Sequence, residues 1–195
     1  MIVVLDPGHG GADAGCSALH GAWQEKRFTL DVARLARDAC YALSSEIEPV
    51  LTRDADTALP LSVRARLARE AKADLVISIH ANAFGDRAAR GAMSFWLAED
   101  SRPYAEELSR LIPDELRRKR GAVFRATETE WPRVVNVLHY HDAPAVLLEC
   151  GFATNAHDLD SLRDPLVQQG IANAIAKTAH LALLTKEATH ASPAN

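Results

Sequence analysis

The sequence predicts a single α/β domain in which a mostly parallel sheet carries helices on both faces. Its length of 195 residues suits one compact domain. Its content of 48% hydrophobic and 25% charged residues is that of a globular protein rather than a disordered or fibrous one. Short apolar runs alternate along the chain with amphipathic helical patterns, which is typical of a parallel sheet with helical connections.

Five short runs rich in β-branched residues are expected to form strands. Most of them are apolar at every position rather than at every second one, so they predict strands that are buried on both faces. The runs span residues 2–5, 49–52, 75–80, 93–97 and 145–149.

Four other segments have apolar residues at three- and four-residue spacing, the pattern of a helix with one buried face. They span residues 28–43, 61–72, 104–118 and 165–184. We expect the folded domain to cover residues 1–185 and the polar residues 186–195 to form a frayed tail.

Charge and cysteine content exclude several classes of protein. A formal net charge of −4 gives no general attraction to nucleic acid or to an anionic membrane. No run approaches the roughly 18 apolar residues that cross a bilayer, and the N-terminus lacks the pattern of a secretory signal. Cys16, Cys40 and Cys150 are an odd number of widely spaced cysteines, so we expect free thiols in a monomer.

The glycine-rich segment after the first predicted strand does not fit a phosphate-binding loop. Asp13 stands where a dinucleotide-binding turn has its third glycine, and Cys16 stands where a P-loop has its lysine. We expect the glycines instead to let the backbone turn sharply beside His9 without crowding its side chain.

Four reactive side chains lie where predicted strands or helices begin or end. His9 follows the first strand, His80 and Glu149 end two others, and Glu25 opens the first helix. Ligands of open α/β sheets bind beyond the carboxyl ends of the strands, so these side chains are expected to converge there. Two histidines and one carboxylate are a common ligand set of hydrolytic zinc. Glu149 would then be free to act as the base that takes a proton from the attacking water.

Ordinary structural roles also explain each of these residues singly. A histidine at a strand end is commonly hydrogen bonded within the fold, and a glutamate is favoured at the start of a helix by the helix dipole. However, His80 and Glu149 follow deeply apolar runs, where a polar group without a partner is costly. The spacing contains no H-E-x-x-H or C-x-x-C motif, so spacing alone leaves the zinc site and the structural arrangement equally open.

The segments around these residues resemble those of the zinc-dependent N-acetylmuramoyl-L-alanine amidases, a family of peptidoglycan amidases. The resemblance covers nearly the whole chain. It rests on seven segments in order: VVLDPGHGGADAG, EK at 25–26, LTRDAD, L-x-x-R at 61–64, ADLVISIHANA, RG at 120–121 and PAVLLECGFATN. It implies an α/β fold with a six-stranded sheet, and hydrolysis of the amide between the lactyl group of N-acetylmuramic acid and the first L-alanine of the stem peptide.

By this resemblance His9, Glu25 and His80 match the family's ligands for one zinc ion per chain, and Glu149 matches its catalytic glutamate. The partners implied are the muramic acid and stem peptide of peptidoglycan. His139 and His141 lie two residues apart and could bind a metal, but a position near the substrate is favoured over metal binding. The candidate substrate contacts are Asn82, Trp23, Arg120, His139 and His141.

Other functions remain open at this point. One is a non-catalytic peptidoglycan-binding or regulatory homologue, and another is a zinc peptidase or deacetylase that acts on a different bond of the wall. Without a signal pattern or a wall-binding module, the chain resembles an endolysin that is made in the cytoplasm and acts on the cell wall. A mature exported enzyme is the alternative.

Overall fold

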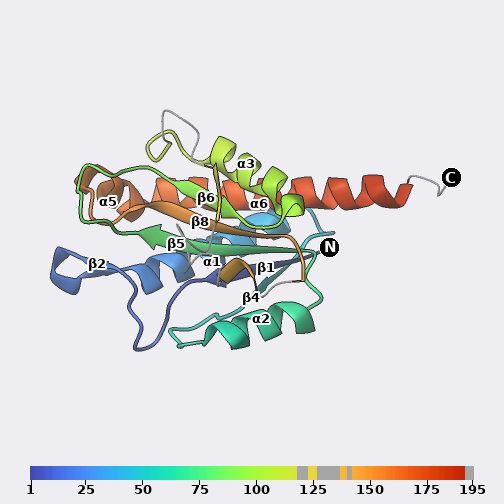
Figure 1. Cartoon of the computed structure of the whole chain (residues 1–195), viewed down its shortest axis with the longest axis horizontal. Helices are drawn as coiled ribbons and strands as arrows, with labels where there is room; N and C mark the ends of the chain where they lie inside the picture. The colour runs from blue at the N-terminus through green and yellow to red at the C-terminus, as the bar shows by residue number, and fades with distance from the viewer. Residues whose placement is uncertain (118–122, 127–136, 140–141, 192–195) are drawn as a thin grey trace.

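A six-stranded sheet forms the centre of the computed structural model, which describes residues 1–117, 123–126, 137–139 and 142–191 (Figure 1). The strands lie in the spatial order β4-β1-β5-β8-β6-β7. Their bounds are β1 (Ile2–Pro7), β4 (Glu48–Leu51), β5 (Leu75–Asn82), β6 (Met93–Trp96), β7 (Val123–Arg125) and β8 (Ala145–Phe152). A separate small hairpin pairs β2 (Ser17–Ala18) with β3 (Trp23–Gln24).

The sheet is mostly parallel, as predicted. Strand β1 pairs in parallel with β4 and β5, and β5 pairs in parallel with β8. Strand β6 runs antiparallel to β8 and parallel to β7. The carboxyl ends of β1, β5 and β8 therefore meet at one edge of the sheet, where ligands of such folds bind.

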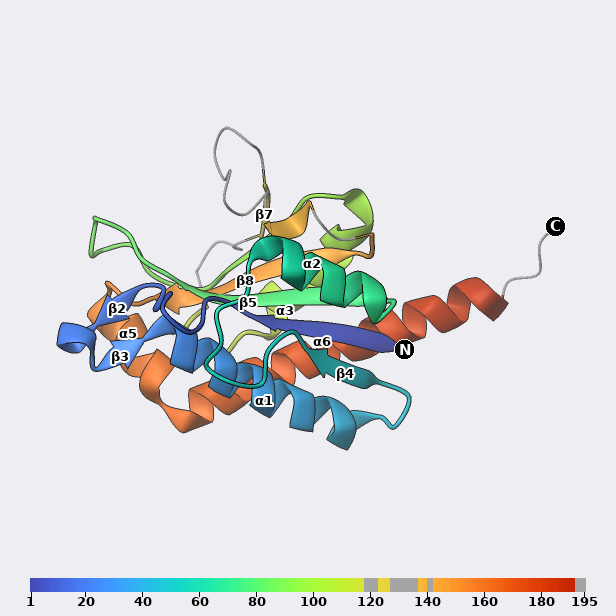
Figure 2. The same ribbon diagram turned by 90° about the horizontal axis from the view of Figure 1, so that it is seen from below.

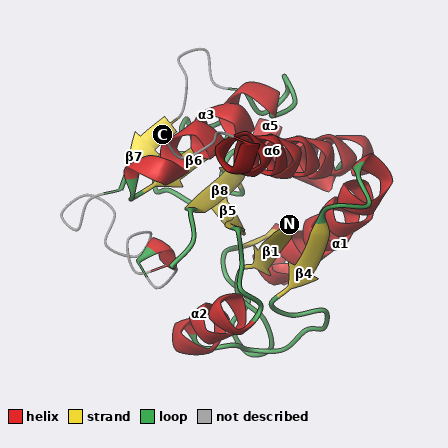
Figure 3. Ribbon diagram, turned by 90° about the vertical axis from the view of Figure 1, so that its right-hand side faces the viewer, coloured by secondary structure: helices red, strands yellow, loops and turns green. Residues whose placement is uncertain are grey.

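Helices cover both faces of the sheet, but unequally. Figure 3, which views the sheet along its strands, shows α1, α3 and α6 on one face and α2 on the other. The helices are α1 (Glu25–Leu43), α2 (Leu61–Glu70), α3 (Arg102–Leu111), α5 (Ala156–Arg163) and α6 (Pro165–Ala191), with two short 3-10 turns at Leu19–Gly21 and Glu99–Ser101. Among the described residues, none of the helices combines the length and the apolar character that a bilayer crossing requires.

Side chains alternate between the two faces of each strand, and this alternation places the polar residues. Ile77, Ile79, Leu148 and Cys150 belong to the larger core cluster, which includes residues of α1, α3 and α6. The intervening residues Val76 and Leu147 belong to the smaller cluster on the α2 side. By the same period of two, His80 and Glu149 lie on the α2 side of the sheet. Cys150 is buried in the larger core cluster, and the prediction that all three cysteines are free thiols is confirmed.

Two strands extend further than the sequence pattern predicts. Strand β5 continues to Asn82 and β8 continues to Phe152, so His80 and Glu149 lie within strands rather than at their ends. They are directly paired across β5 and β8, and the pairing shifts by a bulge between His80 and Asn82. His80 and Glu149 interrupt the apolar runs because their side chains face the site, but strand pairing continues beyond both residues.

Two predicted helix ends need correction, and one helix was missed. Helix α3 ends at Leu111, because Ile112 precedes Pro113 and adopts the extended backbone that a following proline favours. Helix α5, which was not predicted, starts at a cap where the Asn155 side chain accepts hydrogen bonds from the backbone N–H groups of His157 and Asp158. Helix α6 continues to Ala191, so residues 186–191 are helical rather than frayed.

The end of α6 projects beyond the sheet in two perpendicular views (Figure 1, Figure 2). Lys186 on this part of the helix forms an ion pair of 2.7 Å with Asp74, which directly precedes β5. The ion pair links the projecting turns to the sheet.

The central strand β8 provides a test of the core. Leu148 is fully buried, so Leu148→Ala is expected to lower the free energy of unfolding by about 2–5 kcal/mol, through lost transfer energy and the cavity left behind. The matched control is Leu166→Ala, whose side chain is 81% exposed and whose effect is expected to stay within about 0.5 kcal/mol. Urea denaturation measures both values, and equal losses in the two variants would contradict the assigned core.

Candidate metal centre

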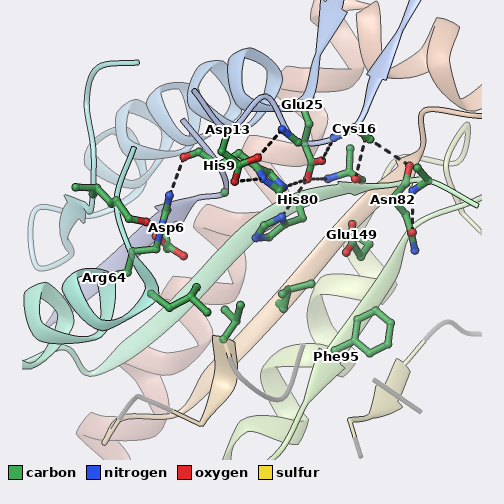
Figure 4. A pocket seen from close by; sticks show the side chains of 18 of the residues that line it. Asp6, His9, Asp13, Cys16, Glu25, Arg64, His80, Asn82, Phe95 and Glu149 are labelled. Carbon is green, nitrogen blue, oxygen red and sulfur yellow. Dashed lines mark hydrogen bonds and ion pairs between the residues drawn. The ribbon is translucent and has the colours of Figure 1, made fainter. Parts of the chain in front are cut away.

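Three of the predicted residues converge above the carboxyl edge of the sheet (Figure 4). His9 follows β1, Glu25 is the first residue of α1, and His80 comes from β5. Glu25 Oε1 lies 3.0 Å from His9 Nε2 and 3.0 Å from His80 Nδ1. One nitrogen or oxygen from each residue lies within 4.8 Å of the others, so the group could hold a metal ion.

Further contacts orient each of these side chains. Asp13 Oδ2 lies 2.8 Å from His9 Nδ1, which leaves Nε2 to face Glu25. Glu25 Oε2 accepts a hydrogen bond of 2.8 Å from the Cys16 backbone N–H, and Oε1 accepts one of 3.0 Å from the Ala81 backbone N–H. The carboxylate is therefore fixed from both sides by the main chain.

Two glycines allow the side chains to approach the loop this closely. A Cβ atom on Gly8 would lie 2.2 Å from His80 Cε1, and one on Gly15 would lie 2.5 Å from Glu25 Oε2. Gly15 also has a φ of +64°, a conformation that other residues adopt at a cost. These contacts confirm that the glycines of this loop prevent crowding around His9 and its neighbours.

The electrostatics of the cluster favour a cation. Burial alone would raise the pKa of Glu25, but hydrogen bonds and charge interactions with His80 and His9 hold it well below its usual range. Burial likewise opposes the charged form of His9, yet Glu25 and Asp13 outweigh it and raise the pKa of His9 to about 9. The arrangement that stabilises a proton on His9 would also stabilise a divalent cation in its place, so the residues present fit a metal ion.

Glu149 lies beside this cluster without taking part in its hydrogen bonds. It is the strand neighbour of His80, and its Oε2 atom is shielded from solvent and has no hydrogen-bond partner among the residues that the structure describes. Burial raises the pKa of Glu149 to about 7; the charge of His80 opposes this rise, and the charge of Glu25 adds to it. The site thus contains a carboxylate suited to exchanging a proton near neutral pH.

The cluster opens into a cavity of about 860 Å³, which is lined by residues of β1, β5, β6 and β8 and of the segments next to them. Its wall includes apolar side chains from α2, β6, β8 and the segment 137–139. These are Leu61, Phe95, Val137 and Leu147. A pocket with apolar walls and a few converging polar groups is the usual form of a small-molecule or substrate site.

The predicted substrate contacts have different outcomes. Asn82 lines the cavity. Trp23 is not among the described lining residues, and its ring packs on Phe28 at a centroid distance of 5.8 Å, so a substrate contact of Trp23 stays a prediction. His139 is exposed and lies two residues after Val137 of the cavity wall. Arg120 and His141 lie outside the described residues.

Sequence reasoning missed several residues that organise the site. Asp13 was considered as an obstacle to phosphate, although its position four residues after His9 in a tight loop could have indicated a partner for the imidazole. Arg64 was noted as part of a motif, without the contacts described below. The backbone N–H groups that bind Glu25 carry no signal in the sequence.

Comparison with known proteins identifies the family to which this chain is related. Residues 3–180 match the family model described as N-acetylmuramoyl-L-alanine amidase. The N-acetylmuramoyl-L-alanine amidase LytC of Bacillus subtilis is 32% identical over 173 residues, which cover 89% of this chain and 34% of LytC. The probable cell wall amidase LytH of Staphylococcus saprophyticus is 31% identical over 180 residues, 89% of this chain and 55% of LytH. The chain thus spans about a third to a half of these two relatives.

Solved structures agree with this assignment. The catalytic domain of CwlV, an N-acetylmuramoyl-L-alanine amidase from Bacillus (Paenibacillus) polymyxa var. colistinus, superposes with a TM-score of 0.81 at 30% identity, covering 94% of this chain and 98% of that one. An N-acetylmuramoyl-L-alanine amidase from Clostridium difficile 630 gives a TM-score of 0.84 at 28% identity, covering 95% and 97%. The architecture and the extent of the match both show that the chain belongs to the N-acetylmuramoyl-L-alanine amidase family.

Proposed function

We propose that this chain is a zinc-dependent hydrolase of the amide bond between N-acetylmuramic acid and L-alanine in peptidoglycan. The observation that carries the proposal is the gathering of His9, Glu25 and His80 in one cavity beside Glu149, whose Oε2 atom has no hydrogen-bond partner among the described residues. Membership of the amidase family supports the choice of bond.

The metal ligands in this proposal are His9 Nε2, His80 Nδ1 and one oxygen of Glu25. Two imidazoles and one carboxylate suit zinc, and three protein ligands leave a coordination position for water or substrate. A zinc ion bound here supplies Lewis-acid polarisation of the amide carbonyl and makes a water more acidic. Asp13 keeps the His9 ring in the orientation and tautomer that ligation needs.

Glu149 moves the protons. Its Oε2 atom makes no hydrogen bond to the described residues, so it is available to accept a proton from the attacking water. The same carboxyl then donates that proton to the nitrogen of the departing L-alanine. Burial supports both steps because it raises the pKa of Glu149 toward neutrality, where a group gives and takes protons with similar ease.

Two alternative activities make different demands on the same site. A non-catalytic wall-binding homologue would have no need for a complete ligand set beside a carboxylate oxygen without a hydrogen bond, and the described residues of this chain assemble both. A peptidase or deacetylase would release other products, which mass spectrometry distinguishes from intact muramic acid and a stem peptide with a free L-alanine amino group. Whether the chain reaches the wall as an endolysin or as an exported enzyme stays a prediction from the sequence.

Glu149→Gln tests the proton-transfer role. The amide cannot take the proton of the attacking water, so kcat for release of stem peptides from purified sacculi is expected to fall about 10²–10⁴-fold. Zinc content, measured by elemental analysis, is expected to stay at the level of the unsubstituted protein. Glu115→Gln, at an exposed position, is the matched control and should retain full activity. Retained activity in Glu149→Gln would refute the assignment.

Metal removal tests the zinc requirement. Dialysis against a chelator is expected to abolish release of stem peptides and to lower the melting temperature, because a ligand that binds the folded state stabilises it. One equivalent of Zn²⁺ should restore both, whereas Mg²⁺ should restore neither, since it prefers oxygen ligands. A chelated protein that cleaves sacculi at the original rate would exclude a catalytic metal.

Asp13→Ala tests the partner of His9. Loss of the carboxylate frees the His9 ring to rotate, so the dissociation constant for Zn²⁺ is expected to rise about 10–100-fold in competition with a chromophoric chelator. Asp160→Ala on α5 is the control, because Asp160 is exposed and pairs with Arg163 instead. Equal zinc affinity in the two variants would show that Asp13 does not support the ligand.

A further inference from the structure

A buried arginine on α2 holds the stretch of main chain that carries His9. The Arg64 side chain is only 6% exposed, and every one of its guanidinium nitrogens donates hydrogen bonds. Nη1 donates to Asp6 Oδ1 at 2.7 Å and to the Pro7 carbonyl oxygen at 2.7 Å. Nη2 donates to the His9 carbonyl oxygen at 2.7 Å, and Nε donates to the Leu59 carbonyl oxygen at 3.1 Å. Figure 4 shows Arg64 and Asp6 next to the cluster of ligands.

The held segment has a conformation that needs external support. His9 has a φ of 61°, in the left-handed region that a residue with a side chain rarely adopts. Gly8 directly before it lies against the ring of His80, where a Cβ atom would clash. A small shift of this turn would therefore change the position of His9 and its distance from His80 together.

Arg64 also joins this turn to the wall of the cavity. Leu59 and Leu61 line the cavity, and the carbonyl oxygen of Leu59 is bound by the same guanidinium that binds the carbonyl oxygen of His9. A single planar group thus bridges the ligand turn and the apolar wall.

The ion pair with Asp6 does not by itself account for this arrangement. Asp6 also accepts hydrogen bonds from Thr52 at 2.6 Å and from Ser78 at 2.9 Å. Most of the hydrogen bonds of Arg64 go to main-chain carbonyls instead. A lysine could keep the charge beside Asp6, but its single ammonium group lacks the fork of donors that reaches three separate carbonyls.

We propose that Arg64 is a positioning residue of the metal centre, which fixes the turn at His9 in the geometry that binds the ion. This inference rests on the metal site of the proposed function. It assigns to the α2 arginine an effect on metal affinity and coordination geometry, in addition to its effect on stability.

Arg64→Lys and Arg66→Lys form a matched pair for the first test, because both lie on α2 and Arg66 is 61% exposed with a loose ion pair to Glu70. The dissociation constant for Zn²⁺ is measured by competition with a chromophoric chelator, and the visible absorption of the Co²⁺-loaded protein reports coordination geometry. Arg64→Lys is expected to bind Zn²⁺ at least about 10-fold more weakly and to shift the Co²⁺ bands. Arg66→Lys is expected to match the unsubstituted protein in both.

A second pair separates positioning from folding. Asp6→Asn is compared with the double variant Asp6→Asn/Arg64→Gln. The double variant removes both charges of the buried ion pair, so we expect it to fold even if Arg64→Lys does not. Removal of the positive charge of Arg64, considered alone, favours Zn²⁺ binding because it removes a repulsion between two cations. Weaker binding in the double variant than in Asp6→Asn therefore reports the loss of positioning, and we expect a difference of at least about 10-fold.

The outcomes distinguish this inference from the proposed function. If the unsubstituted protein binds Zn²⁺ and the arginine variants bind it equally well with unchanged Co²⁺ spectra, the positioning role is wrong and the proposed function stands. If the unsubstituted protein binds no Zn²⁺, the proposed function fails, and the positioning role fails with it.

Discussion

The carboxylate of Glu25, buried between two imidazoles, is the interaction on which the rest of the site depends. Its side chain is 4% exposed and lies within 3.0 Å of one nitrogen of each histidine. A buried carboxylate is costly unless it is paired and hydrogen bonded. Two backbone N–H groups and two imidazoles meet that requirement here, and the resulting negative centre suits a cation. Glu25 itself opens α1, and the α/β fold supplies its partners from two other elements, the loop after β1 and strand β5.

The surroundings of this centre show how a fold can hold strained ligands in place. The turn at His9 has a left-handed backbone, and glycines on both sides of it permit contacts that any larger residue would block. Buried arginines bind the carbonyl groups of this turn. Arg53 donates to the carbonyl oxygens of Pro7 and Gly8, and Arg64 donates to those of Pro7 and His9. Such supporting contacts commonly tune metal affinity as strongly as a weak ligand does.

Much of the fold and the identity of the central residues could be predicted from the sequence. Continuous apolar runs indicated the parallel strands, and the polar residues that follow two of these runs, His80 and Glu149, proved to be neighbours in the site. The predicted ends of these strands were wrong because one polar residue, His80 or Glu149, interrupts each apolar run, whereas backbone pairing continues beyond it. The nearness of Trp23 to Glu25 in the sequence does not determine which way its ring points on β3, and the ring packs on Phe28. Contacts made by the backbone and by long arginine side chains depend on three-dimensional distance, which no local pattern encodes.

The location of the bound metal tests the central claim most directly. Crystals grown with Zn²⁺ and measured on both sides of the zinc absorption edge would give an anomalous difference map of the site. The account predicts one strong peak per chain at about 2.0–2.2 Å from His9 Nε2, His80 Nδ1 and a Glu25 oxygen, with Glu149 outside the coordination sphere. A peak elsewhere, or a fourth side chain that completes the coordination at this one, would contradict it.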